Sequence, residues 1–463
     1  MSGWWSTQAS EGKSPAALAA VVAIGAAALA APWFGHFDDG DAQLYLVLAR
    51  HMAAARAWLD PQYLRHVYPH FREHLPFGVW PFAAAELIAG DAGARAVAAL
   101  CAMGTLLLVA WLGRRLFGDW QAAAAVLVLG LTESFFRYGA QTRLDTLLIL
   151  LANVAAVPAL LGSRKAAHWM AGAAVAAMAV LVKGPFGLLP FVAAGLARAI
   201  DDRRALSWTA AGSLAAAAPL AAFLAADRLW LHQGWWDGYL RGQILASASG
   251  ARPDGTPGVL SPLRFVAGRF WPGLPLAALG SFAAVRRKES HLQCKVVAVF
   301  CGLMLLALCL PARKVWNHTL VAYPGLALLA GAGLQPLRGW LERRSSRAAA
   351  TLAGAAALAW AGAPLLGRAM TRGCAVPPEF GPALSALQPG DEALVVAWPQ
   401  RWAVIATLAA ERRLEPISLD RLPDADPTLP SLALVWQPQW RPARGWQEIA
   451  RAREWALLRK VVK

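Results

Sequence analysis

The chain has 463 residues, of which 57% are hydrophobic and 16% are charged, and its formal net charge is +16. Soluble domains carry about 25% charged residues, so this composition argues against a soluble protein and predicts a membrane protein. Short cytoplasmic loops and contact with anionic lipid account for the positive charge without nucleic acid. The five cysteines form no C-x-x-C pair, which excludes the usual signatures of a disulfide framework or a zinc ribbon.

Apolar runs of roughly 17 to 25 residues predict about eleven membrane-spanning helices. Alanine and glycine dominate these runs, as is typical of membrane helices that pack through small residues. The first run is expected to be a retained helix and not a cleaved signal peptide, because many further spans follow it. The predicted spans are 15–34, 93–112, 120–137, 144–162, 166–182, 184–199, 205–226, 272–285, 294–311, 318–337 and 347–367.

Basic residues predict the orientation of these spans. With the N-terminus in the cytoplasm, each short loop on the cytoplasmic side carries a basic pair or triple, as the positive-inside rule requires. This orientation places residues 35–92 and everything after about residue 368 outside the membrane. The basic groups are Arg114–Arg115, Arg164–Lys165, Arg203–Arg204, Arg286–Arg287–Lys288 and Arg343–Arg344.

The first external region begins with FDDGDAQLYLVLARHM, which places Asp38, Asp39 and Asp41 within four positions. The residues that follow predict an amphipathic helix suited to lie along the membrane surface. Asp41 would then lie at or near the N-cap, where aspartate is favoured. Capping accounts for one carboxylate and not for three, so catalysis stays open beside capping. The apolar stripe consists of Leu44, Val47, Leu48 and Met52.

The segment HVYPHFREHLPFGVW (66–80) spaces His66, His70 and His74 by four residues, with Glu73 beside the last. Such spacing can imitate a metal site. Pro69 breaks the helix that would align the three imidazoles. We therefore expect polar loop histidines here, one of them in contact with a phosphate group.

Positively charged residues also occur in the other external segments, against the usual bias. The long loop from 227 to 271 contains Arg241, Arg252, Arg264 and Arg269, and a guanidinium matches phosphate well. Each of these residues alone would read as a capping or snorkelling side chain. Together they predict a basic pocket at the outer membrane boundary, with carboxylates at its rim. The shorter external turns add Arg137, Arg143, Asp145, Lys183, Arg313, Lys314 and His318.

The C-terminal region changes character. Short strands are predicted at 392–398, 414–419, 432–437 and 454–462, with a helix at 401–413. This alternation predicts a small α/β domain, so we divide the chain into a membrane domain (1–367) and an extracytoplasmic domain (368–463). The small domain shows no catalytic constellation, which favours a structural cap.

These motifs resemble the GT-C superfamily of membrane glycosyltransferases, and within it the aminoarabinose transferases that modify lipid A and the protein mannosyltransferases. The first external loop of that branch reads D-E-x-R-Y, with Arg and Met further along. This chain has Asp41, Tyr45, Arg50 and Met52 at matching offsets and lacks the Glu and the Arg. The departure leaves aminoarabinose without support as the substrate.

A second family stretch, like Y-F-E-K-P-P-L-x-Y-W, corresponds to FREHLPFGVW. It retains Glu73, Pro76 and Trp80, with His74 in place of the lysine. The RLD at 143–145, the KG at 183–184, the segment KVWNHTLVAYPGLALLAG and the α/β tail follow in family order. The resemblance covers nearly the whole chain through short motifs.

The resemblance implies a mostly α, polytopic membrane helix bundle of GT-C type in a bacterial inner membrane, with its C-terminal domain in the periplasm. It implies an inverting transfer of a hexosyl or pentosyl group from a polyprenyl-phosphate donor. The acceptor would be a hydroxyl or phosphate on lipid A, another envelope glycan or protein. The sequence shows neither a dinucleotide-binding fingerprint nor a P-loop, in agreement with a lipid-linked donor.

The same resemblance implies roles for individual residues. The catalytic base would be Asp41, with Asp39 in reserve, because a carboxylate must accept the proton of the acceptor hydroxyl. No metal ligands are expected in this branch, although some superfamily members need a divalent cation. The donor phosphate would be bound by Arg143, Lys183, Arg241, Lys314 and His74, and the substrates by Tyr45, Glu73 and Asp145.

Three other functions share parts of this pattern. A transporter or flippase of lipid-linked sugars would have similar spans but would more often carry ionisable residues at mid-span. Its matched pair of broken helices is not evident either. An oligosaccharide ligase or polymerase would rely on arginines, and an inactive assembly subunit would need no base. Dependence of sugar transfer on Asp41 separates the enzyme from the transporter and the inactive subunit.

Overall fold

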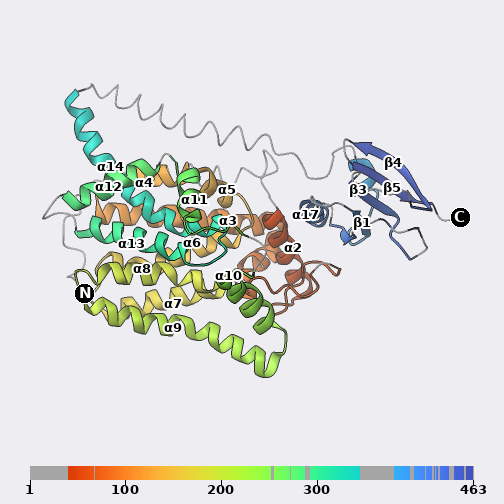
Figure 1. Ribbon diagram of the computed structural model, residues 1–463, viewed down its shortest axis with the longest axis horizontal. Coiled ribbons are helices and arrows are strands. Elements are labelled where there is room, and N and C mark those ends of the chain that lie inside the picture. The colour runs from red at the N-terminus through yellow and green to blue at the C-terminus, as the bar shows by residue number, and fades with distance from the viewer. Residues whose placement is uncertain are drawn as a thin grey trace.

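The computed structural model describes residues 40–66, 68–251, 255–271, 273–286, 292–344, 380–396, 401–411, 413–419, 422, 424–425, 428–436, 443–452 and 455–461. The described chain is mostly helical, with one five-stranded sheet near its C-terminus (Figure 1). The predicted fold class is confirmed in these respects. Asp38 and Asp39, the spans at 15–34 and 347–367 and the domain boundary near residue 368 lie outside the described residues.

A helix overlaps each predicted span from 93–112 to 318–337. These helices are α3 (Trp80–Leu116), α4 (Asp119–Gly130), α5 (Glu133–Gly139), α6 (Leu144–Leu160), α7 (Ala166–Lys183), α8 (Leu189–Arg198), α9 (Arg204–Ala226), α12 (Gly273–Arg286), α13 (Leu292–Cys309) and α14 (Tyr323–Arg344). Shorter helical elements are η2 (Pro76–Gly78), η3 (Gly184–Gly187), η4 (Asp227–Leu231), η5 (Trp236–Leu245), α10 (Ala246–Ser249), α11 (Ser261–Arg269) and η6 (Trp316–Ala322).

Within the described residues, four helical segments are long and apolar enough to cross a membrane: Pro76–Leu116, Ala166–Gly187, Arg204–Leu231 and Leu292–Cys309. A fifth span would consist of α5 and α6, which meet at a bend of 109°. Helices α4, α8 and α12 are apolar but short. The number of spans therefore stays a prediction, whereas the apolar bundle itself is confirmed.

Small residues allow close helix crossings in this bundle. Where α12 meets α14, a Cβ on Gly280 would collide with the carbonyl oxygen of Leu329, and a Cβ on Gly333 with that of Leu276. Both obstacles are backbone atoms, which side-chain rotation cannot move. The predicted packing through small residues is confirmed at this crossing.

One end of the bundle carries the features that the sequence predicts to be external. Asp145 at the start of α6 contacts Lys183 at the end of α7, so these two helices run antiparallel and their connection around Arg164–Lys165 lies at the other end. A helix of 17 residues is about 25 Å long, which separates the two ends. This arrangement agrees with the predicted orientation, which stays a prediction.

The predicted helix of the first external region is α2 (Gly40–Ala55), and it is covered on more than one face. Its apolar stripe is buried, and so are Gln43, Tyr45 and Leu46 between the stripe residues. Helix α3 of the bundle packs on one side, and α17 (Arg401–Glu411) of the C-terminal region packs on another. Helix α2 therefore lies between two protein layers, and α17 covers side chains that the pattern had left to solvent. Its position along a membrane surface stays a prediction.

The C-terminal region, here called the tail domain (380–461), contains a mixed sheet of order β2-β1-β3-β5-β4. Strand β1 pairs in parallel with β2 and β3, and α17 forms the crossover between β1 and β2. The predicted α/β character is confirmed. The strands are β1 (Glu392–Val396), β2 (Glu415–Ser418), β3 (Leu432–Trp436), β4 (Trp446–Ala452) and β5 (Trp455–Lys460), and a short helix, α16 (Gly381–Leu384), precedes them.

Strand β4 was not predicted. It pairs only with β5 at the edge of the sheet and contains a bulge between Glu448 and Ala450. Its sequence WQEIARA has polar residues on both faces, so it lacks the short apolar run by which the other strands were predicted. The position of β4 in the sheet is set by its antiparallel pairing with β5 and not by its own sequence pattern.

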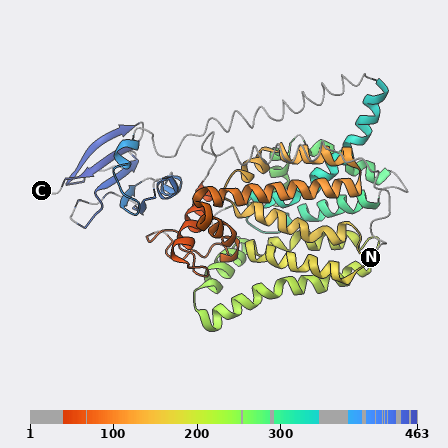
Figure 2. The same cartoon turned by 180° about the vertical axis from the view of Figure 1, so that it is seen from behind.

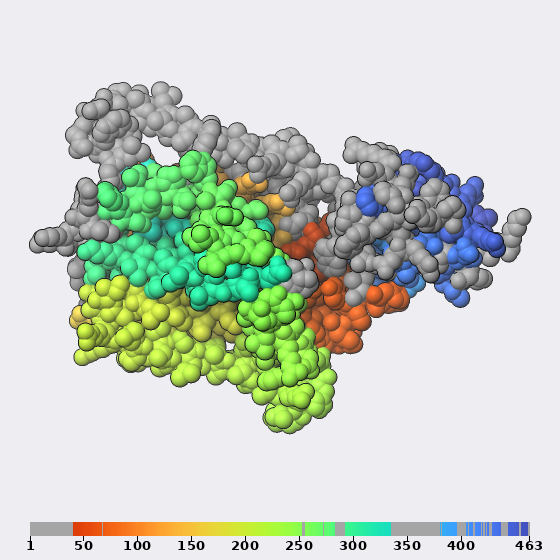
Figure 3. Space-filling model, in the orientation of Figure 1, coloured from red at the N-terminus to blue at the C-terminus, as the bar shows by residue number. Residues whose placement is uncertain are grey.

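The tail domain rests on α2 and the loop after it. Figures 2 and 3 show the red segment of α2 and the first external region between the helical bundle and the blue tail domain. The loop contacts the beginnings of two strands: the amide of Arg65 donates to Glu415 (3.4 Å), and His66 Nε2 lies 2.9 Å from Glu392 Oε1. The tail domain is thus docked by its strand beginnings.

The stability contributed by His51, which lies on α2, is expected to fall below about pH 6.5. Burial lowers the pKa of His51 on α2 from its ordinary value of 6.5; Glu415 acts in the opposite direction and Arg50 in the same one. The unfolded chain therefore binds the proton more readily, so stability falls as pH drops through the ordinary value. Thermal unfolding between pH 5 and 8 should show a steeper acid loss for the wild type than for His51→Gln. Parallel curves would contradict this expectation.

Candidate active site

Four charged side chains from three parts of the sequence meet where α2 joins the bundle. This charged cluster consists of Asp41, Arg143, Asp145 and Lys183. Asp145 Oδ1 lies 2.7 Å from Lys183 Nζ, and Asp145 Oδ2 lies 3.7 Å from Arg143 Nη1. Arg143 Nη1 also lies 3.2 Å from Asp41 Oδ2. The cluster thus has two positive and two negative groups, linked in the order Lys183, Asp145, Arg143, Asp41.

Exposure changes sharply along this chain of contacts. The side chains of Lys183, Asp145 and Arg143 are 5%, 2% and 3% exposed, whereas that of Asp41 is 56% exposed. Buried charges persist only when they are paired, which the contacts provide. Asp41 is therefore the carboxylate of the cluster that an external reactant can reach.

Local structure explains why these side chains converge. Arg143 has an extended backbone (φ −135°, ψ 135°) directly before α6, and its carbonyl accepts a hydrogen bond from Thr146 Oγ1 at 2.9 Å. Asp145 lies in the first turn of α6 and Lys183 in the last turn of α7. Each charge therefore complements the partial charge of its own helix end.

The glycine after Lys183 is required by the site. Gly184 has φ +68°, and a Cβ there would collide with the hydroxyl of Tyr239, a buried residue of η5. The K-G pair thus ends α7 and admits the tyrosine of the second external loop next to Lys183.

Gly184→Ala is expected to destabilise the protein by about 1–3 kcal/mol, since it adds backbone strain and displaces Tyr239. The control is Gly302→Ala in α13, where nothing lies within 4 Å of a new Cβ and φ is ordinary. Thermal unfolding in detergent should show a lower midpoint for the first variant and an unchanged or slightly higher one for the second. Equal midpoints would contradict the packing argument.

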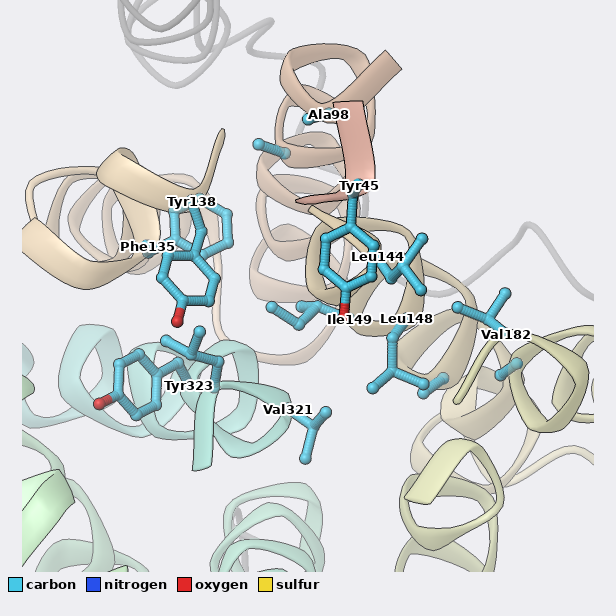
Figure 4. Close-up of a cluster of buried hydrophobic side chains, with 14 of the residues drawn as sticks. Tyr45, Ala98, Phe135, Tyr138, Leu144, Leu148, Ile149, Val182, Val321 and Tyr323 are labelled. Atoms are coloured by element: carbon cyan, nitrogen blue, oxygen red, sulfur yellow. The ribbon is translucent and has the colours of Figure 1, made fainter. Parts of the chain in front are cut away.

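Tyr45 extends from α2 into the bundle. Figure 4 shows its ring directed toward Leu144 and Ile149 of α6, and the side chain is buried. Burial, followed by the charges of Asp41 and Asp145, raises the pKa of Tyr45 well above its ordinary value of 10.0. The phenol therefore stays protonated beside the cluster, and it also interacts electrostatically with Glu73.

Aromatic rings connect the cluster to the second external loop. The guanidinium of Arg143 lies 4.1 Å from the centre of the Tyr138 ring, which contacts Trp316 at 5.2 Å between centroids. On the other side, the exposed Arg269 of α11 lies 3.8 Å from the Trp316 ring centre. Each guanidinium is thus stabilised by cation–π contact with one ring, and the two rings contact each other edge to face. Of the loop arginines that the structure describes, Arg269 is thus connected to the cluster.

A second basic region forms a small cavity next to the cluster. Its His318 stacks on Phe186 with ring centroids 4.1 Å apart and is close enough to Asp145 to interact electrostatically. Lys314 is buried and donates to the carbonyl of Pro311. The cavity is lined by Phe186, Pro262, Leu308, Pro311, Arg313, Lys314, Val315, His318 and Thr319.

Most of the residues predicted from the sequence are brought together. Besides the charged cluster and Tyr45, His74 lies near Tyr45, with ring centroids 5.8 Å apart, and Glu73 is its neighbour. Lys314 lies in the adjacent cavity. Arg241 does not join them: it is 68% exposed and pairs with Asp237 on its own helix.

Three further residues were not singled out as site residues. Asn317 donates from Nδ2 to Asp145 Oδ1 over 3.4 Å, and Tyr138 and Trp316 form the aromatic connection. The segment KVWNH contains two of them, so its place in the family order was the signal that could have indicated them. Tyr138 gave no such signal, because its role depends on the bend between α5 and α6.

The three spaced histidines separate in the structure. His66 contacts Glu392, His70 contacts Asp60 at 3.2 Å, and His74 packs beside Tyr45. In the part of the chain that the structure describes, no group of three His, Cys, Asp or Glu side chains is arranged to hold a metal ion.

Known proteins resemble the chain in sequence and in structure. A family model described as dolichyl-phosphate-mannose-protein mannosyltransferase matches residues 73–226, a segment that includes Arg143, Asp145 and Lys183. None of the curated proteins matches the sequence at a significant level. ArnT from Cupriavidus metallidurans, solved with undecaprenyl phosphate, is similar in structure with a TM-score of 0.69 and 16% identity, over 96% of this chain and 97% of that one.

The fold of the chain is the GT-C fold. The archaeal oligosaccharyltransferase AglB from Archaeoglobus fulgidus, solved with an inhibitory peptide and a dolichol-phosphate, is also similar, with a TM-score of 0.56 and 14% identity. That match covers 87% of this chain and 64% of AglB. The suspected resemblance to the GT-C superfamily is thereby confirmed. At such identities the likeness establishes the GT-C fold, and the reaction has to be argued from the site.

Proposed function

We propose that the protein is an inverting glycosyltransferase that moves a sugar from a polyprenyl-phosphate donor to an acceptor on the outer side of the membrane. The observation that supports this most is the charged cluster. It exposes one carboxylate, Asp41, and anchors it through Arg143 to a buried ion pair. An exposed carboxylate held by a rigid support is suited to accept a proton from a bound hydroxyl.

The reaction can be written with these groups. The acceptor oxygen attacks the anomeric carbon from the face opposite the phosphate, and the hydroxyl proton passes to Asp41. The bond between the anomeric carbon and the phosphate oxygen breaks, and its electron pair leaves with the lipid phosphate. Configuration is inverted through an oxocarbenium-like transition state. The product is a glycoside, and free polyprenyl phosphate is released.

A phosphate leaving group needs cationic stabilisation. Arg143 and Lys183 are already paired with carboxylates, so they are less available than their charge suggests. The cavity that contains Arg313, Lys314 and His318 supplies further positive groups beside the cluster. We therefore place the phosphate between the cluster and this cavity, with His74 at the other side. Arg241 would reach it only through movement of the second loop.

The class of donor is supported by the relatives. ArnT was solved with undecaprenyl phosphate and AglB with a dolichol-phosphate, so two proteins of this fold bind lipid phosphates. We extend this class of donor to the present chain. The further parts of the proposal are a hexosyl or pentosyl group, an acceptor on lipid A, another glycan or protein, and a bacterial inner membrane with the tail domain in the periplasm.

A donor panel tests the proposal. Purified protein in nanodiscs is incubated with polyprenyl-phosphate sugars and crude envelope acceptor, and the release of free polyprenyl phosphate is followed. We expect the wild type to consume one donor and Asp41→Asn to consume none. Equal turnover by both proteins would assign the base elsewhere, to Asp39 first. Transport of labelled lipid without consumption of any donor would instead establish a flippase, the alternative that shares these features.

The proposal includes no essential metal ion. The same assay with EDTA tests this part: activity that persists supports a metal-free reaction. Activity that is lost and then restored by Mg²⁺ or Mn²⁺ would add a divalent cation.

A further inference from the structure

Helix α2 has two functional faces. At roughly 100° per residue, Asp41 and Arg50 are about 900° apart, so they lie on opposite sides of the helix. Gln43 and Arg50 are about 700° apart and share one side. The Asp41 side faces the charged cluster, and the Arg50 side faces the tail domain.

Arg50 joins three elements with one guanidinium. It pairs with Asp91 of α3 through two nitrogens: Nη2 donates to both carboxylate oxygens at 2.9 Å, and Nε donates to Oδ1 at 3.3 Å. It also donates to the carbonyl of Ala409 (3.3 Å) and to that of Ala410 (3.1 Å) in α17. Its side chain is only 13% exposed. A lysine could not satisfy these acceptors together, because it lacks the planar fork.

The acceptors in α17 are available for a structural reason. Ala409 and Ala410 belong to the last turn of the helix (Arg401–Glu411), where carbonyl groups lack partners within the helix and carry partial negative charge. Arg50 therefore binds the negative end of α17. On the same side of α2, buried Gln43 contacts Thr407 Oγ1 of α17 at 3.4 Å.

The tail domain docks on the loop after α2 through the beginnings of its parallel strands. Glu392 and Glu415, which the loop after α2 contacts, are the first residues of the parallel strands β1 and β2. In open α/β sheets ligands bind at the opposite, carboxyl ends of the strands. The contact with α2 is therefore not at the edge where such sheets bind ligands. This agrees with a role of the tail domain in supporting α2 and not in binding substrate.

We infer that the tail domain is a positioning element for α2, and that Arg50 is the positioning residue through which it holds Asp41 in place beside Arg143. The catalytic consequence rests on the proposed role of Asp41. Displacement of a catalytic group by about 1 Å can lower turnover by roughly a hundredfold without contact between the altered residue and the substrate.

The test uses the full-length protein in nanodiscs and compares Arg50→Ala, Arg50→Lys and Thr407→Val with the wild type. Hydrogen exchange is measured on the amides of α2, and kcat and KM for the donor are measured separately. We expect Arg50→Ala to increase exchange across residues 40–55 and to lower kcat by about tenfold to a hundredfold, with KM within about twofold. Arg50→Lys and Thr407→Val should give smaller changes of the same kind.

The control is Arg451→Ala, which removes an exposed arginine of β4 that pairs with Glu448 on the same strand. It should leave α2 exchange and turnover unchanged. Unaltered α2 exchange in Arg50→Ala would overturn the inference, and so would increased exchange with unaltered kcat. A rise in KM at constant kcat would also overturn it, because it would indicate a role in substrate binding. The exchange measurement does not depend on activity, so a wild-type protein that transfers no sugar would refute the proposed function and not the positioning of α2.

Discussion

Asp41→Asn is expected to lower kcat for sugar transfer by about two to four orders of magnitude, the range that general-base catalysis contributes. Asparagine retains the shape of the side chain and can still accept a hydrogen bond from Arg143, but it cannot take the acceptor proton. Donor affinity should stay the same or increase slightly, because the cluster loses a negative charge beside the place of the phosphate. Steady-state turnover and binding of the donor to the variant measure the two effects separately.

The control for this variant is Asp119→Asn. Asp119 Oδ1 lies 2.6 Å from Arg114 Nε, and the Asp119 side chain is 30% exposed. The control therefore removes an aspartate–arginine pair outside the site, at the opposite end of the bundle. It should leave kcat unchanged. An Asp41→Asn enzyme with nearly full turnover would contradict the assignment of the base, whereas equal losses in both variants would indicate general destabilisation.

Lys183→Met is expected to reduce the free energy of unfolding by about 3–5 kcal/mol, because it leaves Asp145 buried without its closest partner. Asp145 is 2% exposed, and the remaining cation, Arg143, lies a full ångström further away than Lys183 does. The loss should be partly reversed in the double variant Lys183→Met/Asp145→Asn, where no uncompensated charge remains. Unfolding titrations with SDS in mixed micelles measure these differences.

A matched control for this substitution is Lys295→Met, since Lys295 is an exposed lysine of α13. It should change stability by less than about 0.5 kcal/mol. If Lys183→Met were as stable as the wild type, the buried pair would contribute little. If the double variant were less stable than the single one, the carboxylate would have an independent structural role.

The sequence predicted the bundle and the tail domain because both follow from hydrophobic patterns. Long apolar runs locate the helices, and short, mostly apolar runs locate β1, β2, β3 and β5. Strand β4 has no such pattern, and its position depends on pairing with β5. The covered position of α2 could not be predicted either, because it depends on α17, whose Thr407 contacts Gln43 of α2 across a separation of 364 residues in the chain.

The site was predictable to the extent that its residues lie at ends of spans on one side of the bundle. This reasoning placed Asp41, Arg143, Asp145 and Lys183 on one face, and the structure brings them into contact. The same reasoning could not predict which of the positively charged side chains are buried in the site and which are exposed. Arg241 and Lys183 look equivalent in sequence, yet one is exposed and the other is buried against a carboxylate. Such differences arise from tertiary packing, as does the role of Asn317.

The charged cluster is neutral as a whole, and this has a consequence for the timing of catalysis. In the proposed reaction Asp41 loses its charge when it accepts the proton, so the cluster acquires one net positive charge. The lipid phosphate gains a negative charge in the same step, as a diester becomes a monoester. The attraction between them therefore increases as the bond breaks. Once Asp41 returns its proton to water, that attraction falls again, which favours release of the spent lipid and prepares the site for the next cycle.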